Sequence, residues 1–311
     1  GTNAIEAALK LARKVTKRTN IFALMGCFHG MTMGALALTT DMVSRAGAGV
    51  PLHDVTHIPA PYMFPELDTV AYMEQILTDD HSGVEKPAAL VLETIQAEGA
   101  IFPFDFEWLK RIEDFCRRHE ILLIVDDIQV GCGRSGSFFS FEKAGIYPDM
   151  VVLSKSIGGY GLPMALLLTK PELDIWKPGE HNGTFRGNQM AFVAAKAAIE
   201  YALSVGLYES VDQKSQIVED YMKKEIMPLH ENLAVRGRGL IFVLDMSKAA
   251  PAGSCREVVT ECFKNGLIIE QAGREDSVLK LMPALTISEE ELLKGLEIIK
   301  KSVQAVLARK N

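Results

Sequence analysis

Two short apolar runs near the middle of the chain each lead into a side chain that could do chemistry. Ile121–Val125 is followed directly by Asp126, and Met150–Leu153 is followed two residues later by Lys155. Runs of this length and composition are typical of buried parallel strands. In open α/β sheets the ligand binds beyond the carboxyl ends of the strands, so we predict that Asp126 and Lys155 face one pocket from adjacent strand ends.

A lysine and a carboxylate that converge in one pocket suit the chemistry of pyridoxal 5′-phosphate (PLP). The lysine forms a Schiff base with the aldehyde of the cofactor, and the carboxylate pairs with the pyridinium nitrogen. Taken singly, each residue has a plainer explanation, because an Asp after a strand is often a helix N-cap and a Lys is usually a solvated charge. The prediction therefore depends on the sequence around the pair.

The elements that would position this pair alternate between short apolar strands and amphipathic helices. This alternation favours an α/β fold with a mostly parallel sheet and right-handed crossovers. We predict strands at Ile21–Met25, Val55–Ile58, Ala88–Leu92, Ile121–Val125, Met150–Leu153 and Met164–Thr169, and a strongly amphipathic helix at Phe106–His119.

The pattern changes after a long helical segment over Val205–Glu231. A smaller α+β unit is predicted there, with strands at Leu240–Asp245, Leu267–Glu270 and Val278–Leu281 and helices at Ser254–Asn265 and Ser288–Arg309. We therefore predict a large domain over residues 1–225 and a small C-terminal domain over residues 226–311. Because the chain opens on a helix with no strand before it, we expect the large domain to be incomplete at its N-terminus.

Composition narrows the classes of function. The chain has 311 residues, of which 48% are hydrophobic, and its net charge of −7 gives no reason to expect a nucleic-acid partner. No apolar run approaches the length of a membrane span and no signal peptide opens the chain, so we expect a cytoplasmic protein without a membrane partner. The cysteines are odd in number and lack metal-ligand spacing, which favours reduced buried thiols and no metal site. They are Cys27, Cys116, Cys132, Cys255 and Cys262.

Two strings around the predicted strand ends resemble the class III aminotransferases. They are VDDIQVGCGRSG, which begins at Val125, and PDMVVLSKSIGGYGLPMA, which contains Lys155. The family pairs D-E-x-Q-x-G-x-x-R-x-G with a later strand that ends in x-K-x-x-x-x-G, and the resemblance extends from Gly1 to the terminal helix. It implies the fold of type I PLP-dependent transferases, an α/β fold with a mostly parallel sheet of the seven-stranded type, flanking helices and a small α+β C-terminal domain.

The resemblance implies that PLP is the cofactor and assigns roles around it. Lys155 would form the Schiff base and then carry the proton between substrate and cofactor carbons, while Asp126 would keep the pyridine nitrogen protonated. The phosphate would bind at the helix start formed by Gly1 and Thr2, where backbone N–H groups and the helix dipole attract anions. Without the resemblance, Gly1 and Thr2 would be read as an ordinary helix cap.

The same resemblance places residues on the two faces of the cofactor ring. Phe28 would stack on one face and Ile128 would pack on the other, while Gln129 would reach the phenolic oxygen. The role of His29 is open, since it could simply orient its loop. Thr184 would give its hydroxyl to the cofactor phosphate of a neighbouring subunit, so we expect self-association with a shared active site, although a plain N-cap explains Thr184 equally well.

Carboxylates and one lysine are the candidates for substrate contacts. Glu93 ends the strand Ala88–Leu92 and is expected to hydrogen-bond within the site, while Glu98 follows in the string TIQAEG. In the family, the residue matching Glu98 forms a gate with an arginine near the C-terminus, which helps one site accept an amine donor and a dicarboxylate. The matching string here is VLKLMPALTI, which places Lys280 at the arginine position. Solvated loop charges are an equally good explanation of the two glutamates.

Two departures separate the chain from the ornithine and 4-aminobutyrate enzymes of the family. Met31 stands where those enzymes carry a carboxylate-binding arginine, and Lys280 cannot offer the bidentate fork of an arginine. The strings FHGMT and GEHNGTFRGNQMAFV instead resemble the subgroup of L-2,4-diaminobutyrate:2-oxoglutarate aminotransferases of ectoine biosynthesis. That resemblance implies a ping-pong reaction through a Lys155 Schiff base, in which L-glutamate and L-aspartate 4-semialdehyde give L-2,4-diaminobutyrate and 2-oxoglutarate.

Three alternatives stay open at this point. The chain could be another class III transferase that acts on ornithine, acetylornithine or 4-aminobutyrate, against which Met31 and Lys280 argue. It could belong to a different PLP class, such as a decarboxylase or a mutase on the same fold. It could also be a truncated chain that folds without holding a cofactor, which cofactor colour in the purified protein would test.

Overall fold

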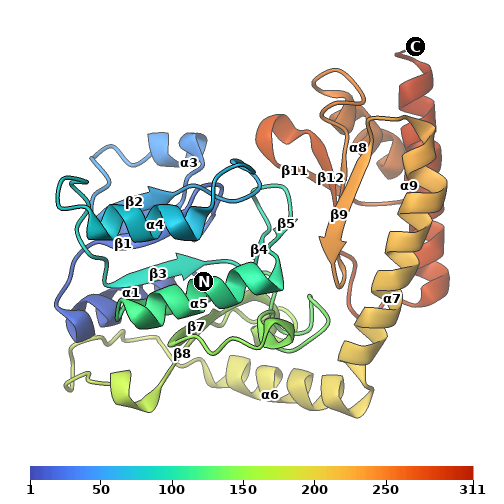
Figure 1. Cartoon of the computed structure of the whole chain (residues 1–311). Helices are drawn as coiled ribbons and strands as arrows, with labels where there is room; N and C mark the ends of the chain where they lie inside the picture. Colours follow the sequence, from blue (N-terminus) through green and yellow to red (C-terminus); the bar gives the residue numbers. More distant parts are fainter. Residues whose placement is uncertain (311) are drawn as a thin grey trace. The chain divides into compact units, whose positions relative to one another are not determined.

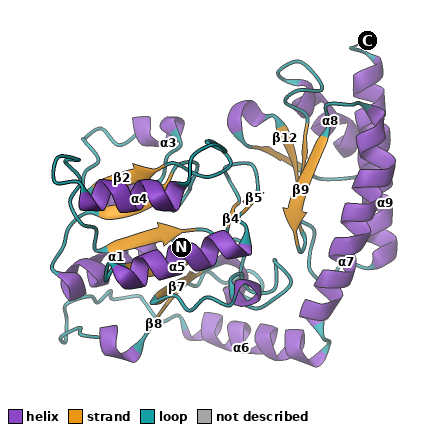
Figure 2. Cartoon of the chain, in the orientation of Figure 1, coloured by secondary structure: helices purple, strands orange, loops and turns teal. Residues whose placement is uncertain are grey.

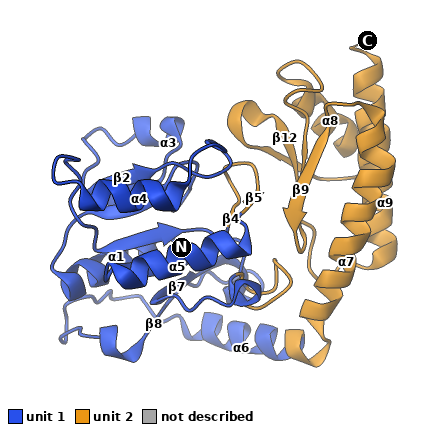
Figure 3. Ribbon diagram, viewed as in Figure 1, with its two compact units in different colours: residues 1–94, 104–131, 141–201 blue, residues 95–103, 132–140, 202–311 orange. Residues whose placement is uncertain are grey.

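The computed structural model describes residues 1–310, which form two compact units. The first unit comprises residues 1–94, 104–131 and 141–201, and the second comprises residues 95–103 and 132–140 together with the chain from residue 202 onward. Figure 3 colours the two units separately. Residues 202–225 belong to the second unit because the helix that follows residue 206 packs against the C-terminal helix. The domain division at residues 225 and 226 stays a prediction.

The first unit is built on one sheet with strand order β2-β1-β3-β6-β7-β8. Every neighbouring pair is parallel except β7 and β8, which are antiparallel, so the predicted mostly parallel sheet is confirmed. The described residues supply six strands to it rather than the seven expected. The strands are β1 (Ile21–Leu24), β2 (Val55–Ile58), β3 (Ala89–Leu92), β6 (Leu122–Asp126), β7 (Met150–Leu153) and β8 (Leu166–Thr169).

Helices cover both faces of this sheet (Figures 1 and 2). The first helix, α1 (Thr2–Thr16), buries its apolar stripe against alternate residues of the strands, as the period of two along each strand requires. On the other face, α5 (Phe106–Arg118) packs on β6 and α4 (Thr69–Thr78) packs on α5. The side chains of Asp68 and Asp105 cap these last two helices by accepting hydrogen bonds from their first backbone N–H groups. Three further helices complete the unit, namely α2 (Met33–Leu38), α3 (Met42–Ala46) and α6 (Gln189–Ser204).

The second unit is a small α+β structure, as predicted. Its antiparallel sheet has the order β11-β12-β10-β9, and a short two-stranded pair, β4 and β5, lies in the same unit. Its core joins apolar residues of this sheet to three helices. The strands are β4 (Ile95–Gln96), β5 (Phe102–Pro103), β9 (Ala234–Arg238), β10 (Ile241–Asp245), β11 (Glu270–Ala272) and β12 (Val278–Leu281), and the helices are α7 (Leu207–Tyr221), α8 (Ser254–Lys264) and α9 (Glu289–Ala308).

Most of the predicted elements lie within a few residues of the observed ones, and the differences are local. The strand predicted at Leu267–Glu270 begins at its last residue, and β9, whose sequence AVRGR is mostly polar, was not predicted. Over Val205–Glu231 the sequence predicts one long helix or a broken pair, and the structure has a broken helical segment: α7 ends at Tyr221 and is followed by a π-helical turn, η4 (Met222–Ile226), and a 3-10 turn, η5 (Met227–Leu229). The other short 3-10 segments are η1 (Glu142–Ala144), η2 (Lys155–Gly158), η3 (Pro171–Leu173) and η6 (Arg274–Asp276).

Within residues 1–310, no single helix is long and apolar enough to span a membrane. The helical segments Gln189–Ser204 and Leu207–Leu229 together have the length and composition of a span, but they are bent by 67° relative to each other.

Candidate active site

The structure places Asp126 and Lys155 at the ends of neighbouring strands. β6 and β7 are parallel, with Asp126 opposite Val152, and Lys155 begins η2 just after β7. Asp126 is 4% exposed, whereas the side chain of Lys155 is exposed. A buried carboxylate and an exposed lysine residue therefore lie at the carboxyl edge of the sheet, which is where α/β folds bind their ligands.

Both oxygens of the Asp126 carboxylate have a partner. Oδ2 lies 2.7 Å from Nδ1 of His29, and Oδ1 accepts a hydrogen bond of 3.1 Å from the backbone N–H of Ile128. Burial alone would lower the pKa of His29, but Cys27 and the hydrogen bond to Asp126 raise that pKa well above its usual value. The pair therefore favours a protonated imidazole behind the carboxylate, which fixes the orientation of the Asp126 side chain.

The backbone at Lys155 has an unusual conformation. Its φ is +50°, in the left-handed region that non-glycine residues seldom occupy. The preceding residue, Ser154, is extended, and its Oγ donates a hydrogen bond of 2.7 Å to the carbonyl of Met164. Backbone strain of this kind tends to occur at functional sites, where the surrounding structure holds it in place.

The start of α1 lies beside the same strand ends. A Cβ atom at Gly1 would come within 3.5 Å of the Cβ atom of Ser154, the residue before Lys155. A Cβ atom at Gly1 would come within 2.9 Å of Cδ1 of Ile128. The glycine thus lets the N-terminus of a 15-residue helix approach the strand ends closely.

A second close approach joins α1 to the loop that contains His29. Oγ1 of Thr2 lies 2.7 Å from Oγ1 of Thr32, and a Cβ atom at Gly30 would come within 2.4 Å of the same Thr2 oxygen. Gly30 also has a φ of +134°. Only glycine satisfies both conditions, so the residue between His29 and Met31 locks the loop onto the helix start.

The residues predicted to contact the cofactor ring, Phe28 and Ile128, also belong to the first unit. Phe28 and Ile128 are each half-buried, and the carboxylate of Glu93 accepts a hydrogen bond of 3.1 Å from the backbone N–H of Phe28. Glu93 therefore holds the loop that carries Phe28, consistent with the hydrogen-bonding role expected for it. Gln129 is half-buried as well, one residue beyond Ile128.

This donor set fits PLP. The cofactor carries a phosphate, a pyridine nitrogen that needs a carboxylate partner, an aldehyde that needs an amine, and a flat apolar ring. The described residues supply a helix start without a side-chain cap, the Asp126–His29 pair, the exposed Lys155, and the half-buried apolar residues Phe28 and Ile128. Nε2 of His29 is a buried polar atom with no hydrogen-bond partner among the described residues.

Glu98 and Lys280 pair with each other within the second unit. Nζ of Lys280 lies 2.8 Å from Oε1 of Glu98 and 3.8 Å from Oε2 of Glu270. The Lys280 side chain is 5% exposed and that of Glu98 is 41% exposed, so the lysine is the buried partner. The pair therefore holds a buried ammonium group against a carboxylate that is itself partly exposed.

Thr184 is the predicted site residue that the structure does not bring to the others. It is exposed in the loop before α6, and the neighbouring Arg186 donates a hydrogen bond of 2.8 Å to Oδ1 of Asn3. The loop therefore lies next to the start of α1, but within residues 1–310 Thr184 itself makes no hydrogen bond with Lys155, Asp126 or Gly1.

The residue that sequence reasoning left open is His29, whose partner lies 97 positions away in the chain. A weak signal existed, since a histidine after one strand and an aspartate after another share the carboxyl edge of a parallel sheet. Spacing alone could not show that the two strands are separated only by β3.

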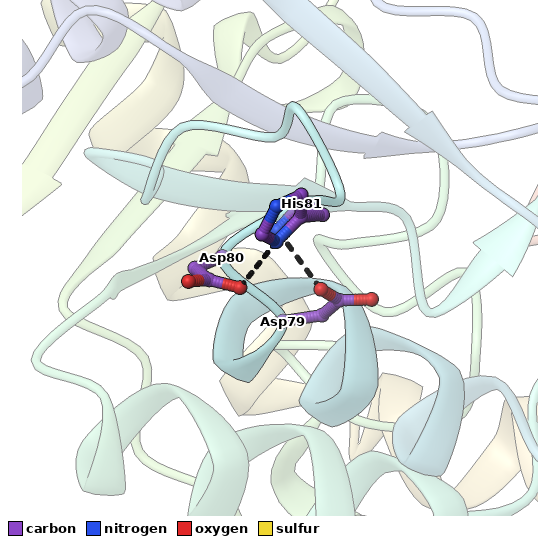
Figure 4. A group of neighbouring side chains, drawn as sticks. All are labelled: Asp79, Asp80 and His81. Carbon is purple, nitrogen blue, oxygen red and sulfur yellow. Dashed lines mark hydrogen bonds and ion pairs between the residues drawn. The ribbon is translucent and has the colours of Figure 1, made fainter.

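One group of side chains outside this region has metal-ligand spacing. Asp79, Asp80 and His81 cluster after α4, and Figure 4 shows them facing one another. Nδ1 of His81 lies 2.6 Å from Asp80, and the backbone N–H of His81 donates to Asp79 at 2.9 Å. Because the His81 and Asp80 side chains are both 90% exposed, a hydrated surface pair explains the cluster, and we assign it no function.

Comparison with known proteins gives a consistent result. The family model described as aminotransferase class-III matches residues 1–303. A diaminobutyrate--2-oxoglutarate transaminase from Bordetella parapertussis is 50% identical over 99% of this chain and 71% of its own length, and one from Oceanobacillus iheyensis is 47% identical over 99% of this chain and 72% of its own. Among solved structures, the ornithine aminotransferase of Toxoplasma gondii, whose description reports PLP at its active site, aligns with a TM-score of 0.89 and 26% identity over 100% of this chain and 72% of that one.

Proposed function

The chain belongs to the class III aminotransferases, and on this premise we propose that it transfers the 4-amino group between L-2,4-diaminobutyrate and 2-oxoglutarate. The reaction converts L-glutamate and L-aspartate 4-semialdehyde to 2-oxoglutarate and L-2,4-diaminobutyrate, in ectoine biosynthesis. The observation that carries the transaminase chemistry is the pairing of an accessible Lys155 with a buried Asp126 at adjacent strand ends. The substrate is proposed because relatives that are 47–50% identical to this chain are named as diaminobutyrate--2-oxoglutarate transaminases.

PLP, the cofactor of this family, withdraws electrons from the substrate carbon that bears the amino group, so that a proton on that carbon becomes acidic. Asp126 would hold the pyridine nitrogen, and its hydrogen bond with His29 keeps the carboxylate aimed in one direction. Gly1 and Thr2 would receive the phosphate at the helix start, where N–H groups and the dipole favour an anion. Phe28 and Ile128 would hold the ring from its two faces.

Lys155 would move the proton. Lys155 is an exposed residue, and the strained backbone at φ +50° fixes where its side chain begins. As general base, the amine would take the proton from C4 of diaminobutyrate or Cα of glutamate. As general acid, it would then give that proton to the carbon of the cofactor that is bonded to the amino nitrogen. Gln129, beside Ile128, would bind the phenolic oxygen of the cofactor.

Lys280 and Glu98 would let one site accept both the dicarboxylate substrate and the amine substrate. Glutamate and 2-oxoglutarate each carry two carboxylates, whereas the semialdehyde and diaminobutyrate each carry one. Lys280 could pair with the second carboxylate of glutamate or 2-oxoglutarate once Glu98 moves away from the lysine. An ammonium is a point charge, so this recognition would be less directional than the bidentate contact that arginine makes. The pairing with Glu98 would neutralise the buried lysine when the small amine substrate is bound.

We also propose that the protein acts in the cytoplasm as a homo-oligomer in which Thr184 of one subunit completes the phosphate site of the next. The Thr184→Ala variant should then bind PLP more weakly, and mixing it with Lys155→Ala should restore activity. In a randomly mixed dimer about one quarter of the sites would carry both native residues, because half of the dimers are mixed and each has one intact site. Mixtures no more active than either parent would contradict a shared site, and Thr169→Ala, at the end of β8, is the matched control.

The substrate proposal is tested with the purified protein and added PLP. Amino transfer to 2-oxoglutarate should be at least about tenfold faster, as kcat/KM, from L-2,4-diaminobutyrate than from ornithine or 4-aminobutyrate. Equal rates with ornithine would replace the proposal by a broader class III activity, for which the structural likeness to ornithine aminotransferase is the supporting observation. Absence of any cofactor colour would contradict the hypothesis that the protein binds PLP.

A further inference from the structure

A tight turn in the second unit carries Glu98, the carboxylate that pairs with Lys280. β4 and β5 form a short antiparallel hairpin, and residues 97–101 connect the two strands. Ala100 and Ile101 are buried within this turn, whereas Glu98 is exposed. The position of the Glu98 carboxylate therefore depends on how the buried part of the turn is held.

The buried part of the turn has an unfavourable backbone conformation. Ala100 has a φ of +93° and Ile101 has a φ of +51°. Residues with a Cβ atom seldom occupy this left-handed region, and it is least suited to a β-branched side chain such as that of Ile101. Such a conformation persists only where the surrounding structure holds it, so the turn needs contacts from outside the hairpin.

Arg236 on β9 supplies these contacts. Its Nε donates hydrogen bonds of 3.0 Å to the carbonyl of Ala100 and 3.1 Å to that of Ile101, and its Nη2 donates one of 2.8 Å to Ala100. The guanidinium also lies 4.1 Å from the ring centroid of Phe102. A guanidinium carries its donors in a rigid fork, which allows one side chain to hold two successive carbonyls.

The guanidinium is itself fixed in place. Its Nη1 lies 2.7 Å from Oδ2 of Asp245, and Oδ1 of Asp245 accepts a hydrogen bond of 2.9 Å from the backbone N–H of Ser247. On the turn, a Cβ atom at Gly273 would come within 2.6 Å of Cβ of Ala100, so the turn also packs closely against the chain before β12. The turn is thus held by directed hydrogen bonds and by close packing.

The contact between Glu98 and Lys280 is sensitive to the position of this turn. Oε1 of Glu98 lies 2.8 Å from Nζ of Lys280, which is within hydrogen-bonding distance. The other carboxylate near Lys280, that of Glu270, lies 3.8 Å away and is 75% exposed. Because hydrogen bonds weaken steeply with distance and angle, a small displacement of the turn would cost Lys280 its one close carboxylate partner among these two.

We propose that Arg236 is a positioning residue for substrate recognition, because it holds the turn of residues 97–101 so that Glu98 stays paired with Lys280. This inference rests on the proposed function of Glu98 and Lys280. There, Glu98 competes with the second carboxylate of glutamate for Lys280, and it neutralises the lysine when diaminobutyrate is bound. Release of the turn therefore favours glutamate over diaminobutyrate as the amino donor.

Hydrogen–deuterium exchange of the full chain, with PLP in every sample, tests whether Arg236 holds the turn. The backbone N–H of Ile101 donates to the carbonyl of Ala97 at 3.2 Å, so its exchange reports on the turn. Arg236→Met keeps a long apolar side chain without the donors, and Ile101 should then exchange at least about tenfold faster. Arg309→Met, which removes an exposed ion pair with Glu261, is the control and should leave this exchange unchanged.

The two half-reactions test whether this hold acts through Glu98. We expect Arg236→Met and Glu98→Gln each to lower the ratio of kcat/KM for diaminobutyrate to kcat/KM for glutamate by at least about fivefold. The double variant should shift this ratio no further than Glu98→Gln alone, because both changes act on one contact. Arg236→Lys, which keeps the charge beside Asp245 but lacks the fork, should lie between Arg236→Met and the native protein, and it replaces Arg236→Met if that variant does not fold.

Two results would overturn the proposal. One is unchanged exchange of Ile101 in both Arg236 variants. The other is a change in the ratio that is the same size with and without Glu98→Gln, which would assign Arg236 a general structural role. A ratio that does not change in Glu98→Gln itself would overturn the proposed function of Glu98 and the substrate part of this inference, while the exchange measurement would still decide whether Arg236 holds the turn.

Discussion

His29 and Asp126 form the buried pair on which the active-site geometry depends. The imidazole is 2% exposed, the carboxylate is 4% exposed, and the two share a hydrogen bond of 2.7 Å. The second carboxylate oxygen is held by a backbone N–H, so the Asp126 side chain has one orientation. A pyridine nitrogen would therefore meet a carboxylate that is already in place, which lowers the cost of binding and of reaction.

The raised pKa of His29 makes stability depend on pH. Burial opposes the charged form, but Cys27 and Asp126 together raise the pKa in the folded state above the usual value of 6.5. A group of this kind stabilises the fold fully below the unfolded pKa and loses that contribution as the pH rises through the folded pKa. His29→Asn keeps a donor for Asp126 but does not titrate, so its unfolding free energy should fall less than that of the native protein as the pH rises above about 6.5.

Denaturant unfolding of the PLP-free protein between pH 6 and pH 9 measures this difference. His81→Asn is the control, because His81 also contacts an aspartate but is 90% exposed. The same pH dependence in the native protein and in His29→Asn would mean that the imidazole does not carry the extra proton.

At the scale of elements, the site depends on how closely α1, the loop after β1 and the ends of β6 and β7 approach one another. A Cβ atom at Gly30 would come within 2.4 Å of Oγ1 of Thr2, and one at Gly1 would come within 2.9 Å of Cδ1 of Ile128, which would have to move. These glycines act through the contacts between elements and have no chemistry of their own. The helix start, the aromatic loop and the strand ends are thereby held as one unit.

Gly30→Ala should therefore be strongly destabilising. The new Cβ would lie 2.4 Å from Oγ1 and 2.7 Å from Cβ of Thr2, and the φ of +134° is unfavourable for alanine. We expect a loss of about 2–4 kcal/mol from overpacking and backbone strain. Gly83→Ala, with a φ of +70° and nothing within 4 Å, should lose only about 1 kcal/mol. Equal losses in the two variants, measured by denaturant unfolding, would show that the contact with Thr2 does not matter.

The sequence predicted these elements well because the buried strands are continuous apolar runs and the helices have clear amphipathic stripes. Asp126 and Lys155 were placed correctly on neighbouring strand ends, since the parallel β-α-β pattern leaves few topologies. The partnership of His29 with Asp126 and the close approach of Gly30 to Thr2 could not be predicted in the same way. Both arise from contacts between segments far apart in the chain, which periodicity and local propensity do not reveal because they depend only on neighbouring residues.

At the scale of the whole molecule, the predicted site residues are divided between two compact units. Lys155, Asp126 and the residues around them belong to the first unit, whereas Glu98 and Lys280 pair within the second. The segment that carries Glu98 leaves the first unit after Thr94 and returns at Phe104. Within the second unit this segment is held by Arg236, which donates hydrogen bonds to the carbonyls of Ala100 and Ile101.

Lys280→Ala tests the role of the second unit in substrate selection. Loss of a charge-assisted contact should raise the KM for 2-oxoglutarate about 10- to 100-fold, equivalent to about 1.4–2.7 kcal/mol. The first half-reaction with diaminobutyrate should change less than about threefold, because that substrate carries no second carboxylate. Lys301→Ala, at an exposed ion pair of α9, is the control. Equal effects on both half-reactions would assign Lys280 a structural role instead.

The central claim is that Lys155 carries the chemistry of amino transfer, and one measurement tests it most directly. The native protein and Lys155→Ala are saturated with PLP, and the absorbance of the bound cofactor is followed after mixing with L-2,4-diaminobutyrate. The native protein should show rapid bleaching of the cofactor band, while the variant should bind PLP and bleach at least about 10³-fold more slowly, since it lacks the amine that forms the Schiff base and moves the proton. Bleaching at the native rate in Lys155→Ala would contradict the account.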